Sequence, residues 1–194
     1  MDKTFISAEE LLVDSYRLGV QVYESGFRPD FIVGIWRGGS PVGVAVQECL
    51  EYLGVKTDHL AVRTSYAGMD TYPQMIAKPG AIRVHGIEYL INNLEAEHSL
   101  LLVDDVIGSG RSMLAVRERL ELKCRRNMPH DVRIAAPWFR PHDEVLKPDY
   151  HVRQTQDWLV MPYELVGLTP EEIAVYKPGL SPILARLDAK GPQR

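Results

Sequence analysis

Two adjacent carboxylates and a turn of small residues behind them are the groups of this chain best suited to chemistry. Asp104 and Asp105 end the apolar run 100–103, and the turn Gly-Ser-Gly-Arg-Ser follows at residues 108–112. An apolar run without alternation is typical of a central parallel strand, and ligands of open α/β sheets bind outside the carboxyl ends of such strands. Backbone amides of a turn that enters a helix point one way and can bind a phosphate. The pattern predicts an anion site beside two carboxylates; a plain strand end before a tight turn is the alternative.

A second loop with anion-binding chemistry follows the apolar run 31–35. It reads Arg37-Gly38-Gly39 and comes directly after Trp36. The forked guanidinium of an arginine suits phosphate oxygens, and glycine lets the backbone approach a ligand closely. If both apolar runs are parallel strands, this loop lies at the same sheet edge as Asp104. A simple turn before a helix is the alternative, and the sequence assigns no role to Trp36.

The elements that must position these loops alternate between strands and helices. Their expected ranges are 31–35, 59–63, 100–103 and 132–136 for strands, and 87–94 and 112–122 for helices. Helices also begin after Ser7, which forms a capping box with Glu10, and after Thr169. This alternation predicts an α/β fold with a parallel sheet flanked by helices.

Residues 64–83 show neither a helical nor a strand period and contain two glycines and two prolines. Ordered loops of such length are mostly functional. The stretch is therefore either a catalytic lid or a surface insertion.

Composition narrows the class of protein. The chain has 194 residues, 45% of them hydrophobic, which suits a single domain with a full core. A net charge of −4 counts against broad nucleic-acid binding. Cys49 and Cys124 lack the paired spacing of a disulfide framework or a zinc site. Without an apolar run of about 18 residues or a signal-peptide pattern, no membrane association is expected, and the cytoplasm is the expected location.

The order of residues in the first motif points to a family. No lysine follows its glycines, as a nucleoside triphosphatase loop requires, and the spacing is not that of a dinucleotide fingerprint. The apolar run, Asp104-Asp105 and the small-residue turn instead resemble the phosphoribosyl pyrophosphate motif of the type I phosphoribosyltransferases. The resemblance spans residues 31–164 and is closest to the 6-oxopurine enzymes of bacteria and archaea. It implies one phosphoribosyltransferase-like domain over residues 1–194, with a flexible lid loop and a small hood formed by the N-terminus and residues 140–185.

The resemblance also implies roles for individual residues. Asp104 and Asp105 would hold the ribose hydroxyls and organise Mg²⁺, directly or through water, and Arg37 would neutralise the departing pyrophosphate. Ser65 and Tyr66 match the pair that opens the catalytic lid. The remaining substrate-binding residues that it implies are Gly38, Gly39, Ile107, Gly108, Ser109, Gly110, Arg111, Ser112, Arg140 and Trp158.

Two of these residues concern the base. Arg140 follows the expected strand 132–136, where relatives carry a basic residue that reads the exocyclic oxygen. Trp158 could stack on a nucleobase, although a lone tryptophan is equally at home in a core or an interface.

One position departs from the family pattern. Where Gly108 stands, the 6-oxopurine enzymes commonly carry an aspartate whose carboxylate lies beside a nitrogen of the base and manages its proton. Glycine cannot do this. Phosphate binding therefore follows more firmly from the resemblance than the identity of the base does.

The function that the resemblance implies is transfer of the phosphoribosyl group from phosphoribosyl pyrophosphate to hypoxanthine, guanine or xanthine, in purine salvage. The substrates are then the expected partners, together with a second copy of the chain in a homodimer or higher homo-oligomer. The alternative is a protein that senses phosphoribosyl pyrophosphate and binds RNA or another protein without turnover. The basic cluster Lys123, Arg125 and Arg126 could serve RNA, but cations are also favoured at a helix C-terminus.

Overall fold

The computed structural model describes residues 3–66, 82–142 and 144–188. The chain divides into two compact units, Met1–Leu11 with Asp157–Arg194, and Leu12–Gln156. Each unit is described by itself.

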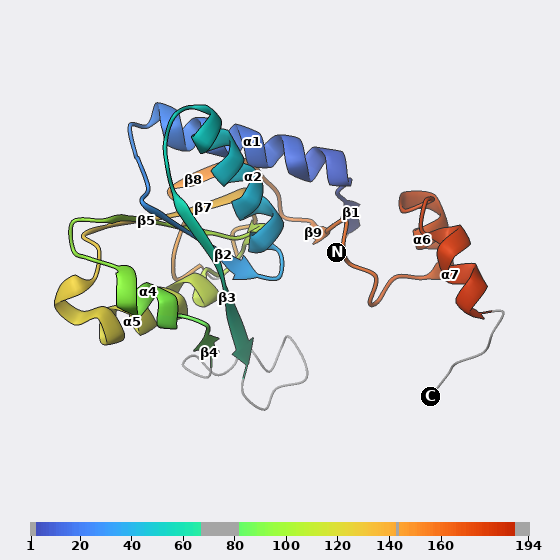
Figure 1. Cartoon of the computed structure of the whole chain (residues 1–194). Helices are drawn as coiled ribbons and strands as arrows, with labels where there is room; N and C mark the ends of the chain where they lie inside the picture. Colours follow the sequence, from blue (N-terminus) through green and yellow to red (C-terminus); the bar gives the residue numbers. More distant parts are fainter. Residues whose placement is uncertain (1–2, 67–81, 143, 189–194) are drawn as a thin grey trace. The chain divides into compact units, whose positions relative to one another are not determined.

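A twisted, mostly parallel sheet is the centre of the larger unit (Figure 1). Its strand order is β4-β3-β2-β5-β7-β6, and β8 also pairs with β7. All pairs are parallel except β3 with β4 at one edge. The strand bounds are Phe31–Trp36 for β2, Asp58–Tyr66 for β3, Ile82–His85 for β4, Ser99–Val103 for β5, Val106–Ile107 for β6, Asp131–Phe139 for β7 and Tyr150–Gln154 for β8. The predicted α/β fold with a parallel sheet is confirmed.

Helices cover both faces of this sheet. Figure 1 shows α1 (Ala8–Glu24) and α2 (Gly39–Tyr52) on one face, and α4 (Glu88–Asn93) and α5 (Arg111–Cys124) on the other; the short 3-10 helix Arg125–Asn127 follows α5. The side chains of residues 100–103 on β5 are fully buried between these layers. This double coverage explains why the run is apolar without alternation.

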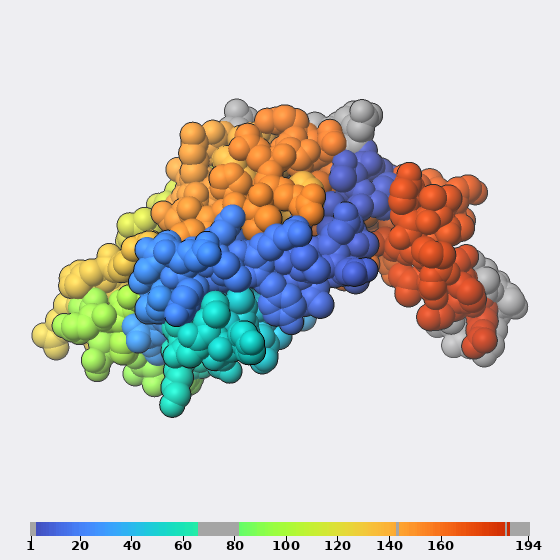
Figure 2. All heavy atoms as spheres, turned by 90° about the horizontal axis from the view of Figure 1, so that it is seen from above, coloured from blue at the N-terminus to red at the C-terminus, as the bar shows by residue number. Residues whose placement is uncertain are grey.

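An ion pair with a buried carboxylate joins α1 to β8. Asp14 is fully buried, and Arg153 donates from Nε to its Oδ2 at 2.6 Å. Arg17 donates to the other oxygen of the same carboxylate at 2.7 Å. Figure 2 shows the blue surface of α1 alongside the orange surface of the segment that contains β8. The carboxylate thus fixes this helix against the last strand of the sheet.

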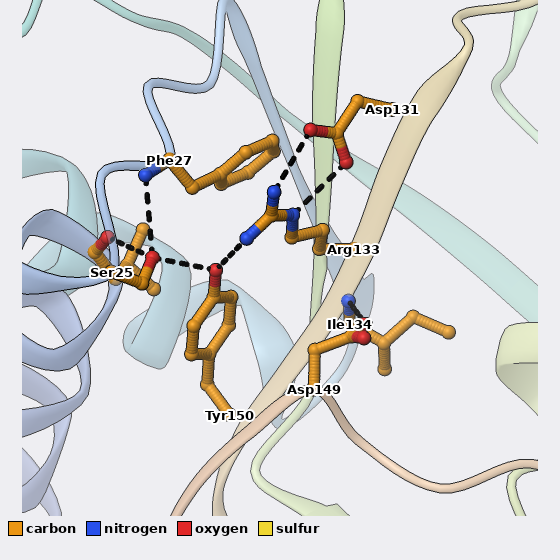
Figure 3. Close-up of polar contacts among 8 residues, drawn as sticks. Ser25, Phe27, Asp131, Arg133, Ile134, Asp149 and Tyr150 are labelled. Carbon is orange, nitrogen blue, oxygen red and sulfur yellow. Dashed lines mark hydrogen bonds and ion pairs between the residues drawn. The ribbon is translucent and has the colours of Figure 1, made fainter.

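A chain of polar contacts joins the end of α1 to β7 and β8 (Figure 3). The Arg133 guanidinium makes a two-pronged ion pair with Asp131, with both N···O distances at 3.0 Å. Its third nitrogen donates to the Tyr150 hydroxyl at 2.6 Å, and that hydroxyl lies 2.7 Å from Ser25 Oγ. Ser25 in turn donates to the Val22 carbonyl, one of the last in the helix. Tyr150 is therefore the link between the sheet and this helix end.

Replacement of Tyr150 by Phe should lower the free energy of unfolding by about 1–2 kcal/mol, because the partly buried Arg133 guanidinium loses one of its acceptors and Ser25 loses its link to the sheet. Urea denaturation measures the change. Tyr52→Phe is the matched control, since Tyr52 is 91% exposed and should show almost no change. Equal stability of the two variants would contradict the role given to this hydroxyl.

The smaller unit pairs the two distant parts of its sequence. β1 (Lys3–Phe5) and β9 (Trp158–Val160) form a two-stranded parallel sheet, followed by α6 (Pro170–Tyr176) and α7 (Ser181–Asp188). Thr169 begins α6 as predicted, and the structure adds a capping box in which Glu172 is the partner. Lys177 is buried, and its Nζ donates to the carbonyls of Met161 and Pro162, both at 2.9 Å. Burial lowers the pKa of this ammonium.

Both predicted bounds of the loop over residues 64–83 are wrong. β3 continues to Tyr66 and β4 begins at Ile82, because the two segments pair with each other in an antiparallel register. Pairing between the two strands stabilises them, although the residues themselves show no strand period. Residues 67–81, where the predicted flexible lid falls, lie outside the described residues, so the lid stays a prediction.

No helix in the described part of the chain is both long and apolar enough to cross a membrane.

Candidate active site

The two predicted anion-binding loops lie at the carboxyl ends of neighbouring strands. β2 and β5 pair in parallel, with Gly34 opposite Val103. Arg37, Gly38 and Gly39 follow β2, and Asp104 follows β5 directly. The structure thus brings together residues that the sequence only placed at a common sheet edge.

The contact between these loops leaves no room for a side chain. A Cβ on Gly38 would lie 2.0 Å from Asp105 Oδ2, and a Cβ on Gly39 would lie 2.3 Å from the Val103 carbonyl oxygen. Both glycines are buried, whereas Arg37 is exposed. Glycine is needed at position 38 because the Asp105 carboxylate occupies the place of a Cβ, and at position 39 because the backbone after β5 does.

Gly39→Ala should destabilise the fold by about 1–3 kcal/mol, because its new methyl group would meet a backbone oxygen that cannot move freely. Chemical denaturation gives the value. Gly179→Ala is a suitable control, since its Cβ would have nothing within 4 Å. A Gly39→Ala protein as stable as this control would show that the loop can shift away from Asp104.

The paired carboxylates are unequal. Burial raises the pKa of Asp104 well above its ordinary value, and the adjacent charge and side-chain hydrogen bond of Asp105 raise it further. Backbone N–H groups of Asp105 and Gly39 hydrogen-bond to the Asp104 carboxylate and act in the opposite direction. Asp105 itself accepts from the Val106 N–H at 2.8 Å. Desolvation outweighs the hydrogen bonds, so Asp104 is a group that a cation or a hydroxyl donor would stabilise in its charged form.

The predicted phosphate turn runs from β6 into α5. Gly110 has a φ of +74°, and its absent Cβ would lie 2.6 Å from the Leu146 carbonyl oxygen. The helix begins at Arg111, and Leu114 donates to the Gly110 carbonyl in its first turn. Because α5 starts here, its partial positive charge faces the turn that contains Ser109 and Ser112.

Arg140 follows β7 and lies beside this turn. Its backbone N–H donates to the Ile107 carbonyl at 2.8 Å. Its own carbonyl is the only described group within 4 Å of a Cβ built on Gly108, at 3.5 Å. Arg140, which is expected to read the base, thus contacts Gly108, the position that departs from the family pattern.

Residues 145 and 146 also cover the turn, which no sequence pattern indicated. Val145 donates from its backbone to the Ser109 carbonyl at 2.9 Å, and Leu146 contacts Gly110 as described. These contacts use backbone atoms, so residue type carries little signal for them. Only the return of the chain after β7 places this segment over the turn.

Three further predicted residues lie elsewhere. Ser65 is on β3, where its Oγ lies 3.0 Å from His85 Nε2, and Tyr66 is the last residue of that strand. Trp158 is the first residue of β9 in the smaller unit and is 40% exposed.

No cluster of three or more metal-ligating side chains occurs among the described residues. Magnesium, however, is often held by one or two carboxylates together with substrate phosphates. The charge of Asp105 raises the pKa of Asp104, and a cation bound by both carboxylates would relieve this repulsion. The pair therefore fits a magnesium ion that arrives with an anionic substrate.

Comparison with known proteins agrees with this geometry. The family model of the phosphoribosyl transferase domain matches residues 7–166. The chain belongs to this family. It is accordingly a phosphoribosyltransferase by fold and domain, with phosphoribosyl pyrophosphate and a base as the substrates that the family implies. No curated protein sequence matches the chain significantly.

Solved structures show the same fold in members that are distant in sequence. A purine phosphoribosyltransferase from Pyrococcus horikoshii is 20% identical, with a TM-score of 0.67 over 87% of this chain and 99% of that chain. The xanthine-guanine-hypoxanthine phosphoribosyltransferase of Helicobacter pylori is 18% identical, with a TM-score of 0.63 over 84% and 95% of the two chains. A hypothetical protein from Neisseria gonorrhoeae with bound ppGpp is 17% identical, with a TM-score of 0.67 over 92% and 97%.

Proposed function

We propose that the protein transfers the phosphoribosyl group of phosphoribosyl pyrophosphate to hypoxanthine, guanine or xanthine. The observation that carries the proposal is the meeting of three loops at one sheet edge: Arg37 to Gly39, the Asp104-Asp105 pair, and the turn at residues 108–112. Each loop supplies groups that suit one part of the donor: the pyrophosphate, the ribose hydroxyls or the 5′-phosphate. The purine-specific names of two fold neighbours support the choice of base.

In this proposal a ring nitrogen of the base attacks C1 of the ribose, and pyrophosphate leaves. Arg37 and the amides of Gly38 and Gly39 bind the pyrophosphate, and Asp104 with Asp105 orients the ribose hydroxyls. The same two carboxylates would hold a magnesium ion, which would supply positive charge next to the leaving group. The turn at residues 108–112 binds the 5′-phosphate.

Base selection falls to Arg140 and Trp158 in the same proposal. The contact of Arg140 with the turn at Ile107 holds its backbone fixed, so its side chain starts from a defined place. Trp158 supplies a π face, worth about 1–3 kcal/mol per stacked base. Ser65 and Tyr66 flank the lid, which would exclude water from the activated ribosyl centre.

The test is a panel of nucleobases incubated with phosphoribosyl pyrophosphate and magnesium, with pyrophosphate release and nucleotide formation as readouts. We expect turnover on at least one 6-oxopurine and none on pyrimidines. Asp105→Asn should weaken donor binding in calorimetry. Turnover on a pyrimidine alone would contradict the proposed substrate class.

A donor-sensing protein without turnover is the second candidate, and Gly108 is the observation that favours it. A phosphate turn without the family's carboxylate keeps donor binding and lacks the group that moves the proton of a purine. Tight binding of phosphoribosyl pyrophosphate with no nucleotide formed from any base would identify this function instead.

A further inference from the structure

A row of aromatic and cationic side chains crosses the sheet next to the active-site loops. Trp36 on β2 pairs with Arg63 on β3, and Arg63 pairs with His85 on β4. Paired residues of neighbouring strands point to the same face, and so do residues two apart on one strand. Arg83, which pairs with Ser65, therefore lies on this face too. We call Trp36, Arg63, Arg83 and His85 the Trp36 platform.

The platform faces solvent, whereas its neighbours in sequence face the core. Val62 is fully buried and Val84 packs against the hydrophobic cluster on the opposite face. Trp36 is 54% exposed, and the three cationic or titratable residues are exposed as well. An exposed indole beside exposed guanidiniums is not explained by packing.

The cations of the platform are not neutralised by the strands that carry them. β2 and β4 contain no acidic residue, and the only one in β3 is Asp58, at the opposite end of that strand. Within the described residues, neither Arg63 nor Arg83 has an ion pair. The single polar link is the 3.0 Å contact of His85 Nε2 with Ser65 Oγ. The platform thus presents unpaired positive charge on a protein whose net charge is −4.

The length of the row indicates the class of ligand. Neighbouring strands lie about 4.8 Å apart, so the row from Trp36 to His85 is roughly 10 Å long. This is the reach from a nucleobase to the second phosphate of its nucleotide. A base can stack on an indole with little preference for its identity, and guanidiniums bind phosphate oxygens with two donors. A single nucleotide therefore fits the length of this row.

We propose that the Trp36 platform binds a nucleoside di- or triphosphate, at a site separate from the Asp104-Asp105 centre. The base lies on Trp36, and the phosphates lie on Arg63, Arg83 and His85. Occupancy of this site does not require the transfer reaction, so the proposal stands apart from the proposed function.

The test titrates ATP and GTP into the full chain by calorimetry and by tryptophan fluorescence, with and without saturating phosphoribosyl pyrophosphate and magnesium. The donor fills the 5′-phosphate turn, so a nucleotide that still binds occupies another site. We expect one nucleotide per chain in both conditions. Arg83→Gln and Trp36→Leu should each weaken its binding about 10-fold, the effect of one lost charged hydrogen bond or stacked base.

Arg119→Gln is the matched control, because Arg119 is an exposed cation on α5 and should bind as the parent does. Inorganic tripolyphosphate should bind more weakly than ATP and should not respond to Trp36→Leu. The proposal is overturned if no nucleotide binds, if Arg83→Gln and Trp36→Leu bind as tightly as the control, or if tripolyphosphate equals ATP. Tighter binding of a single-stranded RNA oligonucleotide than of ATP, lost in Arg83→Gln, would assign the platform to RNA instead.

Discussion

Gly108→Asp should raise turnover on hypoxanthine or guanine near neutral pH by as much as about 10²-fold, the lower end of what a positioned general acid or base contributes. The parent lacks a carboxylate at the place where the 6-oxopurine enzymes that it resembles commonly carry one to manage the proton of the purine. Its turnover should therefore rise with pH as the base ionises. The variant should show a flatter profile, measured as kcat against pH on each purine.

The structure supports this substitution as physically tolerable. A Cβ on Gly108 would meet only the Arg140 carbonyl oxygen, at an ordinary contact distance of 3.5 Å. Gly110, two residues further along the chain, could not take a side chain in this way, because its φ is positive and a Cβ there would lie 2.6 Å from the Leu146 carbonyl oxygen. Gly108→Asn is the control, because asparagine adds equal bulk but has no carboxylate that could accept a proton. If the parent is fast with a flat profile and the Asp variant only loses donor affinity, position 108 serves the phosphate turn alone.

Asp104→Asn should make the protein more stable at neutral pH and a much weaker binder of phosphoribosyl pyrophosphate. The substitution removes a desolvated charge that lies beside the Asp105 carboxylate, and an amide of the same shape can still accept the Asp105 N–H. A gain of about 1 kcal/mol corresponds to roughly 2–4 °C in Tm for a domain of this size. Loss of a charged ligand for the ribose and magnesium should weaken donor binding roughly 10- to 100-fold.

The pH dependence has a definite sign. The pKa of Asp104 is raised in the folded protein, so between its ordinary and its raised value the folded state binds more protons than the unfolded state. Stability from this group is complete below the ordinary carboxyl pKa and is lost as pH rises through the raised value. The stability difference between Asp104→Asn and the parent should therefore grow with pH, as measured by urea denaturation at several pH values.

Glu97→Gln is the control for this series, because Glu97 is an exposed carboxylate and its removal should leave both stability and donor affinity nearly unchanged. An Asp104→Asn protein that is less stable than the parent at neutral pH would show that the carboxylate is well compensated in the fold. Unchanged donor affinity would remove Asp104 from the binding site.

Features that depend on neighbours within a few residues could be predicted from the sequence. The capping box at Ser7 forms as expected, because its partner Glu10 is three residues away, and Thr169 begins α6 as predicted. The run 100–103 is a buried central strand, since an unbroken apolar stretch needs cover on both faces. The turn at residues 108–112 enters a helix as predicted, with Gly110 at the left-handed position that favours glycine. The order of these residues also identified the family.

Features that depend on distant segments were decided by tertiary structure. β1 and β9 are three-residue strands with no pattern of their own and exist because they pair with each other. β4 is a strand because it pairs with the end of β3, and the same register creates the Trp36 platform. The raised pKa of Asp104 requires its burial beside Gly39, a residue of another loop. A sequence records local preferences, whereas desolvation, register and close approach arise only when distant backbones meet.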